Sequence, residues 1–498
     1  MEDSVQSKIL KSAIYDYLGS FTNAILLFLI LIYLLRNLSV EQFGQYNVIL
    51  STIIFFVLFL NFGIPTLILR FLPEYIVKGN FKIAKKFISN GLLLVLGAGV
   101  FTVVISYFID KFHNDLLNKF ALAQFLFIAA IIGFLRVQIR ILKAVFSSFF
   151  QKGFQNLFEV FSSFLKLCLI IFALRMGYGL IGVFTSIGIA ELILIVAYII
   201  KVSGYFKDKE NRGYEISKKR LFKFGFKEYI AKLLSFFWDS RIDAYVITFF
   251  LGTYATGVFY FVISIVMMLV QYMPGTIMVP IAHALYARQY AKSNNKKELN
   301  YLFQLNNKAK TFFIFPAFLG FIILVDKIVP FIFGSKYEES LVLFPIILFF
   351  MVFYLLAIPV RSIINALEKN EITIISGLVI LYKIPALILL TKKFGLYGAA
   401  FALGTSVTIY FFISLVLTKR HIELQYPWMA FSKIFLNSII MGIAVYFMKG
   451  YVHNLSTLIL VIIVGIVIYL ITGYMNKAFS ENDRKLINQP FKRLVFNF

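Results

Sequence analysis

The sequence predicts an all-α integral membrane protein with about 14 transmembrane helices, arranged as two pseudo-symmetric six-helix lobes plus two extra C-terminal helices. Hydrophobic residues make up 60% of the 498-residue chain, whereas soluble domains contain about 45–50%. Apolar stretches long enough to cross a bilayer recur from one end of the chain to the other. The two halves also match each other weakly, which indicates an internal duplication.

The individual spans follow from hydropathy, because a helix needs about 20 mainly apolar residues to cross the hydrocarbon core. The predicted spans are centred near Phe28, Leu58, Gly99, Ala130, Phe164, Glu191, Ser240, Ser264, Leu319, Met351, Val379, Ser406, Ile440 and Gly465. The tenth to twelfth spans are the least cleanly separated. The polar start "MEDSVQSKILKS" runs directly into the first span, so we expect no cleavable signal peptide.

Basic residues are distributed unequally between alternate loops. With a cytoplasmic N-terminus, roughly three quarters of the 49 lysines and arginines fall in cytoplasmic segments, and the outer loops are short and poor in cations. This pattern predicts a multi-pass protein of the cell membrane with both termini in the cytoplasm. It also accounts for the net charge of +25 without a nucleic-acid partner.

The longest loop lies between the sixth and seventh spans, and we assign residues 204–228 to a basic cytoplasmic linker. Its end, "ISKKRLFKFGFKEY", has the pattern of a basic amphipathic helix on the inner leaflet. A solvated basic loop leading into the seventh span is an equally good interpretation of the same residues.

The internal repeat is defined by short matches at a nearly constant offset. "QFGQYNVILS" aligns with "ATGVFYFVIS", which places Gly44 opposite Gly257, and "GLIGVF" from Gly179 aligns with "GLYGAAF" from Gly395. Between them, at similar offsets, three further pairs align: Pro65 with Pro280, Tyr75 with Tyr290, and Asn80 with Asn295. The repeat predicts lobes at residues 1–203 and 229–418, followed by two additional helices and a cytoplasmic tail at 419–498.

Each repeat contains an even number of spans, so both lobes enter the membrane in the same orientation. We therefore expect a symmetry axis along the membrane normal and a central cavity between the lobes. Duplicated lobes that rock around such a cavity are typical of transporters that work by alternating access. The last two spans are nearly free of charge and would line a lateral opening for a lipid tail, or simply face lipid.

Four segments are informative in their order and spacing: "LSVEQFGQYNVI", "DAYVITFFLGTYATGVFYF", "IVPFIFGSKYEES" and "FGLYGAAFALGTS". They resemble segments of the polysaccharide-biosynthesis exporters, which include the oligosaccharide-unit (O-antigen) flippases of the multidrug/oligosaccharidyl-lipid/polysaccharide exporter superfamily. The resemblance covers nearly the whole chain. It implies an activity that moves a polyprenyl-pyrophosphate-linked oligosaccharide from the inner to the outer leaflet. It supplies no catalytic motif, so the candidate site residues come from charge placement alone.

The segment "WDSRIDAY" places Asp239, Arg241 and Asp243 within a predicted span. A charge at the bilayer centre costs at least about 2.5–3.5 kcal/mol, and such residues usually mark a functional site. In a continuous helix the two acids share one face and Arg241 lies on the opposite side. We expect Arg241 to bind an anion and the acids to bind a coupling H+ or Na+, with interhelical ion pairing as the structural alternative.

Other charges lie in the predicted spans, and for each of them two interpretations stay open. Arg136, Arg140 and Lys143 form a stripe that either snorkels to headgroups or captures a diphosphate. Glu191 is a proton carrier or the partner of Lys166. The remaining candidates are the acid Glu159 and the second-lobe cations Lys383 and Arg361, of which Arg361 lies near the inner end and is equally suited to snorkelling.

The sequence also argues against several other activities. A phosphate-cradling G-x-x-x-x-G-K-S/T loop is absent, so we expect no direct use of ATP. One cysteine and four scattered histidines predict no metal site and no cofactor. A membrane glycosyltransferase or polymerase would need a substantial outer loop, so we expect a transporter and not an enzyme. We also expect the protein to be a monomer. A multidrug-type cation antiporter and a peptidoglycan-precursor flippase remain alternatives.

Overall fold

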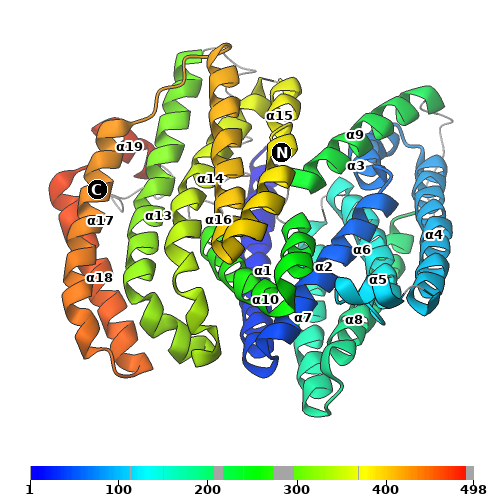
Figure 1. Cartoon of the computed structure of the whole chain (residues 1–498). Coiled ribbons are helices and arrows are strands. Elements are labelled where there is room, and N and C mark those ends of the chain that lie inside the picture. Colours follow the sequence, from blue (N-terminus) through cyan, green and yellow to red (C-terminus); the bar gives the residue numbers. More distant parts are fainter. Residues whose placement is uncertain are drawn as a thin grey trace. The chain divides into compact units, whose positions relative to one another are not determined.

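The computed structural model describes residues 2–112, 114–149, 151–206, 217–238, 241–272, 296–367 and 369–488. Every regular element in these ranges is helical (Figure 1). The chain divides into two compact units, Met1–Gly257 and Val258–Phe498, which are described separately. The predicted residues Asp239, Pro280, Tyr290 and Asn295 lie outside the described ranges.

The first unit is a helical bundle in which α6 is the central element. α6 packs against α2, α3, α4 and α8, while α7 lies beside α1 and α8. Its helices are α1 (Glu2–Asn37), α2 (Val40–Leu60), α3 (Ile64–Val77), α4 (Phe81–Phe112), α5 (Asn114–Lys119), α6 (Leu126–Ser148), α7 (Lys152–Arg175), α8 (Gly179–Ser203), η1 (Gly204–Phe206), α9 (Lys218–Trp238) and the start of α10 (Arg241–Tyr272).

The chain between α1 and α3 shows how local sequence sets the helix boundaries. Ser39 caps α2: its hydroxyl accepts a hydrogen bond from the backbone of Gln42, whose side chain in turn accepts one from the Ser39 backbone. Gly63, with φ of 71°, separates α2 from α3, and Pro65 lies in the first turn of α3. The span predicted around Leu58 is therefore two helices, and Pro65 lies at the start of the second.

The linker end predicted as an amphipathic helix or a loop is helical, since α9 begins at Lys218. It packs against α3. Arg220 lies 3.4 Å from the carboxylate of Glu74 and 5.1 Å from the centroid of the Phe71 ring. A Cβ atom on Gly63 would lie only 2.6 Å from the carbonyl oxygen of Gly225, so the two backbones meet where side chains are absent.

The second unit continues α10 and contains the two additional C-terminal helices. Its elements are α13 (Lys296–Phe333), η2 (Ser335–Ser340), α14 (Leu343–Ala366), α15 (Asn370–Gly377), α16 (Ile380–Lys419), α17 (Trp428–Met448), η3 (Lys449–Tyr451), α18 (Leu455–Asn476) and α19 (Glu481–Asn488). α17 and α18 pack on α13 (Figure 1). The Tyr469 hydroxyl donates a 2.6 Å hydrogen bond to the Phe312 carbonyl, and the Phe312 ring contacts Phe479.

Eleven helices in the described ranges are long and apolar enough to span a membrane. Two of them are interrupted by a glycine with positive φ, Gly252 in α10 and Gly395 in α16, and each combines parts of two predicted spans. α6 is also long enough, but its three cations keep it out of a count based on hydropathy. Allowing for these three cases, the helices agree with the predicted total of about 14.

The backbone preserves the sequence repeat. The aligned residues Gly179 and Gly395 both have left-handed φ values, 53° and 60°. Gly179 opens α8 after the turn that follows α7, and Gly395 interrupts α16 at the corresponding place. Only glycine adopts this conformation without strain, which explains why both copies carry it. The chain is an all-α membrane protein with two pseudo-symmetric lobes and two extra helices.

Candidate functional site

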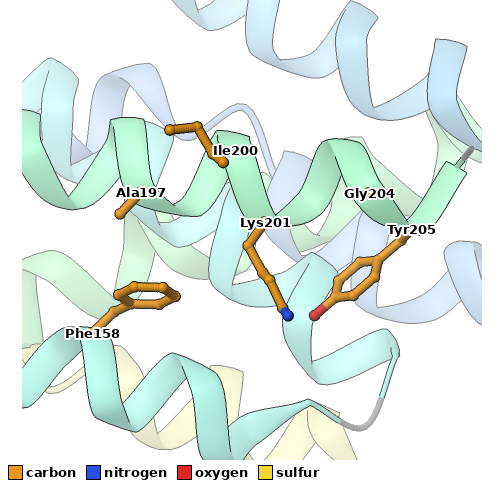
Figure 2. A pocket seen from close by; sticks show the side chains of 6 residues that line it. All are labelled: Phe158, Ala197, Ile200, Lys201, Gly204 and Tyr205. Carbon is orange, nitrogen blue, oxygen red and sulfur yellow. The ribbon is translucent and has the colours of Figure 1, made fainter.

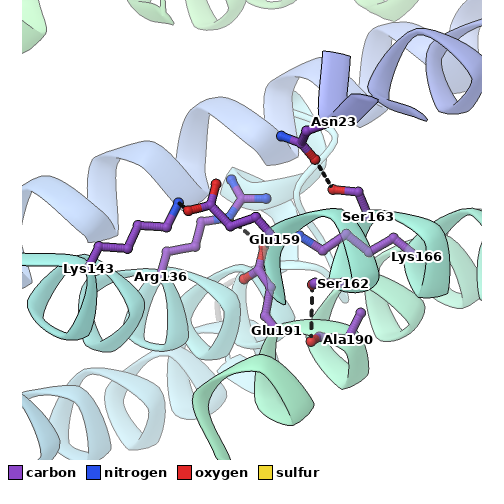
Figure 3. Close-up of polar contacts among 9 residues, drawn as sticks. All are labelled: Asn23, Arg136, Lys143, Glu159, Ser162, Ser163, Lys166, Ala190 and Glu191. Atoms are coloured by element: carbon purple, nitrogen blue, oxygen red, sulfur yellow. Dashed lines mark hydrogen bonds and ion pairs between the residues drawn. The ribbon is translucent and has the colours of Figure 1, made fainter. Parts of the chain in front are cut away.

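The most concentrated group of charged side chains in the described part of the first unit lies between α6, α7 and α8 (Figure 3). α6 supplies Arg136 and Lys143, α7 supplies Glu159 and Lys166, and α8 supplies Glu191. On α6 and on α7 the two charges are seven residues apart, which is about two helical turns and places them on one face. We call these five residues the ionic cluster.

Glu191 is the centre of the ionic cluster. Its side chain is 3% exposed, and its Oε1 atom accepts hydrogen bonds from Arg136 Nε at 3.1 Å and from Lys166 Nζ at 3.2 Å. The other oxygen, Oε2, is buried and has no hydrogen-bond partner among the described residues. Two cations therefore share one oxygen of one carboxylate, which leaves a local excess of positive charge.

Glu159 forms the second half of the ionic cluster. Lys143 Nζ lies 2.9 Å from its Oε1 atom, and Gln155 donates a 2.8 Å hydrogen bond to the same oxygen. The backbone carbonyl of Gln155 in turn accepts a 3.1 Å hydrogen bond from Tyr198 on α8. These contacts fix the position of the carboxylate between α6, α7 and α8.

Small polar residues hold the helices around the ionic cluster. Asn23 on α1 accepts a 2.5 Å hydrogen bond from Ser163 on α7, and Ser162 donates a longer bond to the Ala190 carbonyl on α8 (Figure 3). Tyr46 on α2 lies close enough to Arg136 and Glu191 to interact with both charges. Sequence reasoning missed these residues, because single polar residues in apolar helices carry no signal of their partners.

The ionic cluster contains three cations and two acids, so its formal charge is positive. The side chains of Arg136, Lys143 and Lys166 are 27%, 34% and 19% exposed, which lets them reach a ligand at the surface of the unit. Guanidinium and ammonium groups bind phosphate oxygens, and a carboxylate beside them can take up a proton or a cation. The arrangement can therefore hold an anion.

The predicted stripe on α6 is divided by these contacts. Arg136 and Lys143 pair with acids on α8 and α7, respectively. Arg140 is exposed and remains consistent with either interpretation. For Glu191, the structure contains the predicted pairing with Lys166 and adds Arg136 as a second partner.

The described ranges leave a gap inside "WDSRIDAY". α9 is described as far as Trp238 and α10 from Arg241, so the helix face shared by Asp239 and Asp243 stays a prediction. Asp243 on α10 is fully buried. The Nε atom of Arg241 is buried without a hydrogen-bond partner among the described residues. Arg241 also lies within electrostatic range of Tyr46.

The predicted cations of the second unit do not form a similar cluster in the described ranges. Lys383 on α16 is fully buried. Arg361 on α14 is exposed; it donates a 3.1 Å hydrogen bond to the Tyr410 hydroxyl and lies over that ring. Sequence reasoning missed Lys310 on α13, which is 2% exposed and whose Nζ atom has no hydrogen-bond partner in the described structure. The polar run "NNKAKTFF" that contains Lys308 and Lys310 has the composition of a loop, so nothing in the sequence indicates that Lys310 is buried in a helix.

Comparisons with solved structures identify transporters. The Lipid II flippase MurJ in an inward closed conformation has a TM-score of 0.72 and 19% identity, covering 96% of this chain and 100% of that chain. An inward-facing multidrug resistance MATE family transporter of the MOP superfamily has a TM-score of 0.64 and 16% identity, covering 82% and 94%. A MOP superfamily transporter from Pyrococcus furiosus has a TM-score of 0.52 and 16% identity, covering 82% and 92%.

The sequence comparison agrees with the fold. No curated protein matches the chain, but the family model described as "polysaccharide biosynthesis protein" matches residues 9–286, a range that contains the whole ionic cluster. That match extends over more than half of the sequence. The chain is thus a multi-pass membrane protein with the fold of MOP superfamily transporters, and it belongs to the polysaccharide biosynthesis protein family.

Proposed function

We propose that this protein is a flippase that moves a polyprenyl-pyrophosphate-linked oligosaccharide from the cytoplasmic to the outer leaflet by alternating access, for cell-surface polysaccharide or glycan synthesis. The observation that carries the proposal is the positive ionic cluster inside the helical bundle of a polysaccharide-biosynthesis family member. A diphosphate concentrates negative charge, so it needs cations that are partly shielded from water. A drug cation would instead favour an acidic site.

The proposed chemistry is an exchange of partners around Glu191. In the structure, Arg136 and Lys166 both donate to its Oε1 atom. An incoming diphosphate competes for these donors, because phosphate oxygens accept charge-assisted hydrogen bonds as carboxylates do. Protonation of Glu191 would release both cations to the substrate, and deprotonation would withdraw them. Glu191 thus acts as the coupling acid in this proposal, with H+ as its ion.

The other predicted charges receive secondary roles in the same proposal. Arg140 would extend the phosphate site along α6, and Arg241, Lys383 and Arg361 would contact the substrate at other stages of transport. The acids Glu159, Asp239 and Asp243 would hold cations in place or take part in coupling to H+ or Na+.

Transport of a peptidoglycan precursor is a second candidate. The Lipid II flippase match covers 96% of this chain, and the MATE match covers 82%. The larger coverage supports a lipid-linked substrate in this proposal and does not distinguish between the two sugars.

The proposal includes the orientation and boundaries predicted from the sequence. We place the monomeric protein in the cell membrane with both termini in the cytoplasm, as the loop charges favour. The lobes would comprise residues 1–203 and 229–418, joined by the linker at 204–228 and followed by the helices at 419–498.

A reconstituted flipping assay tests the function. Liposomes with the purified chain and a fluorescent polyprenyl-diphosphate oligosaccharide would be compared for wild type, Arg136→Gln and Lys166→Gln, with Arg175→Gln as control. Arg175 is exposed in the last turn of α7, outside the ionic cluster. We expect flipping by wild type and the control and at least about tenfold slower flipping by the two variants, since each loses a charge-assisted hydrogen bond worth roughly 1.5–3 kcal/mol.

Other outcomes of this assay would support a different function or a different site. Flipping of Lipid II but not of the oligosaccharide would establish the second candidate. A folded wild-type protein that flips neither lipid but exports a cationic dye would replace the proposal with drug extrusion. Wild-type rates in both Arg136→Gln and Lys166→Gln would remove the ionic cluster from the mechanism.

A further inference from the structure

A separate pocket lies at the end of α8, away from the ionic cluster along the same helix. It has a volume of about 510 Å³ and is lined by Phe158 of α7, by Ala197, Ile200 and Lys201 of α8, and by Gly204 and Tyr205 of η1 (Figure 2). Volumes of about 300–1,000 Å³ are typical of ligand sites. The pocket is formed entirely by residues of the first unit.

The lining is apolar except at one end. Phe158, Ala197 and Ile200 offer carbon surface, and the 69% exposure of Ile200 leaves this face open to the membrane. At the other end, the Lys201 ammonium and the Tyr205 hydroxyl are directed toward the same part of the pocket (Figure 2). These two residues are four apart, so they lie on one face of the helical end.

Neither polar group has a hydrogen-bond partner or an acidic partner among the described residues. The Tyr205 hydroxyl is buried and has no hydrogen-bond partner among the described residues. Within the same ranges, the contact found for Lys201 is the Phe154 ring, 3.9 Å from Nζ to the centroid. This cation–π contact places the ammonium but leaves its charge without an acidic counterpart in the described structure. A buried hydroxyl and a positioned cation together form a donor pair for an anion.

We propose that this pocket binds an anionic phospholipid, with one acyl chain on Phe158, Ala197 and Ile200 and the phosphate on Lys201 and Tyr205. Basic pockets between transmembrane helices at the cytoplasmic side are suited to anionic headgroups, and the proposed orientation places this end of α8 at that side. The ring of Tyr205 lies against Phe149 at 4.7 Å, which holds its hydroxyl at the interface. The inference is independent of the transported substrate.

Photocrosslinking of the full chain in nanodiscs tests this site. The probes would be phosphatidylglycerol with a photoreactive group near the headgroup, the matching phosphatidylcholine, and soluble glycerol phosphate as a competitor. We expect the anionic lipid to label the peptide containing Ala197 to Tyr205, with phosphatidylcholine labelling it much less. Lys201→Gln should weaken binding by roughly tenfold, the effect of one charge-assisted hydrogen bond. Tyr205→Phe keeps the ring contact and should weaken binding by about threefold.

Lys111→Gln is the matched control, because Lys111 also lies over a phenylalanine ring, at 5.7 Å, but does not line this pocket. Labelling at α8 should be the same in this variant as in wild type. Equal labelling by phosphatidylcholine, or unchanged labelling in both Lys201→Gln and Tyr205→Phe, would overturn the proposal. So would glycerol phosphate binding as tightly as the lipid, because the apolar lining would then contribute nothing.

Discussion

Lys166 Nζ lies 3.2 Å from Oε1 of Glu191, and Arg136 Nε lies 3.1 Å from the same oxygen. The carboxylate is 3% exposed, so almost all of its interaction is with these two cations and not with water. Removing it would leave Arg136 and Lys166 side by side without the carboxylate that both pair with. The geometry therefore predicts that the stability of the fold depends on Glu191.

We expect Glu191→Gln to lower the free energy of unfolding by about 3 kcal/mol, because a buried pair that loses one partner leaves an uncompensated charge. Combining it with Lys166→Met should recover part of the loss, since one of the two stranded cations is then gone. Thermal unfolding of purified protein in nanodiscs measures both effects. Additive losses in the double variant would show that Glu191 and Lys166 are not coupled.

Gly44 and Gly257 allow α2 and α10 to cross closely within the first unit, so larger side chains there should lower stability for steric reasons. A Cβ atom on Gly44 would lie 1.8 Å from the Thr253 carbonyl oxygen, and one on Gly257 would lie 2.0 Å from that of Val40. Both contacts are with backbone, so α2 and α10 would have to separate. Gly44→Ala and Gly257→Ala should each cost about 1–3 kcal/mol, whereas Gly97→Ala, with no atom within 4 Å, should not destabilise the protein. Equal melting temperatures for all three variants would contradict the close crossing.

Much of the fold was predictable because a membrane imposes regular lengths and a repeat imposes equivalent positions. The aligned residues Gly179 and Gly395 both have a positive φ, which glycine adopts far more easily than other residues, so sequence similarity and backbone geometry indicate the same duplication. The division of the second predicted span at Gly63 was not predictable from hydropathy, because both resulting helices are apolar.

The site was predictable in its residues but not in its pairings. Arg136, Glu159, Lys166 and Glu191 stand out as charges in apolar stretches, which is a strong signal. Their partners depend on how α6, α7 and α8 rotate against one another, and a sequence without an alignment carries no such information. Lys310 was missed for the opposite reason, since it lies among polar residues at the start of a long helix.

Lys308 and Lys310 provide a matched test on one helix. Lys308 Nζ lies 2.7 Å from Asp483 Oδ2, whereas the Nζ atom of Lys310 is buried without a hydrogen-bond partner in the described ranges. Lys308→Met should destabilise the protein by about 3–5 kcal/mol, because Asp483 remains buried without its cation. Lys310→Met removes a buried charge and should leave the melting temperature unchanged or raise it. The opposite order of the two variants would show that Lys310 has an essential partner.

Asp483 also predicts a pH dependence. Its carboxylate is fully buried in α19, where Tyr301 and Lys308 of α13 and the Ser480 backbone donate hydrogen bonds to it. Burial favours the neutral form, but the bonds from Lys308 and Ser480 outweigh it, so the pKa of Asp483 lies below its ordinary value. The folded state therefore binds this proton less readily than the unfolded state does, and ionised Asp483 stabilises the fold.

Because the folded pKa is depressed, this stabilisation is fully present above the unfolded pKa of about 3.9 and is lost as the pH falls through the folded pKa. Asp483→Asn should thus lower the melting temperature by a constant amount between about pH 5 and 7, and the gap to wild type should narrow below about pH 4. The matched control is Glu481→Gln, an exposed acid on the same helix, which should show almost no gap. A gap that widens in acid would mean that Asp483 is protonated in the folded protein, and the contact between α19 and α13 would then rest on neutral hydrogen bonds.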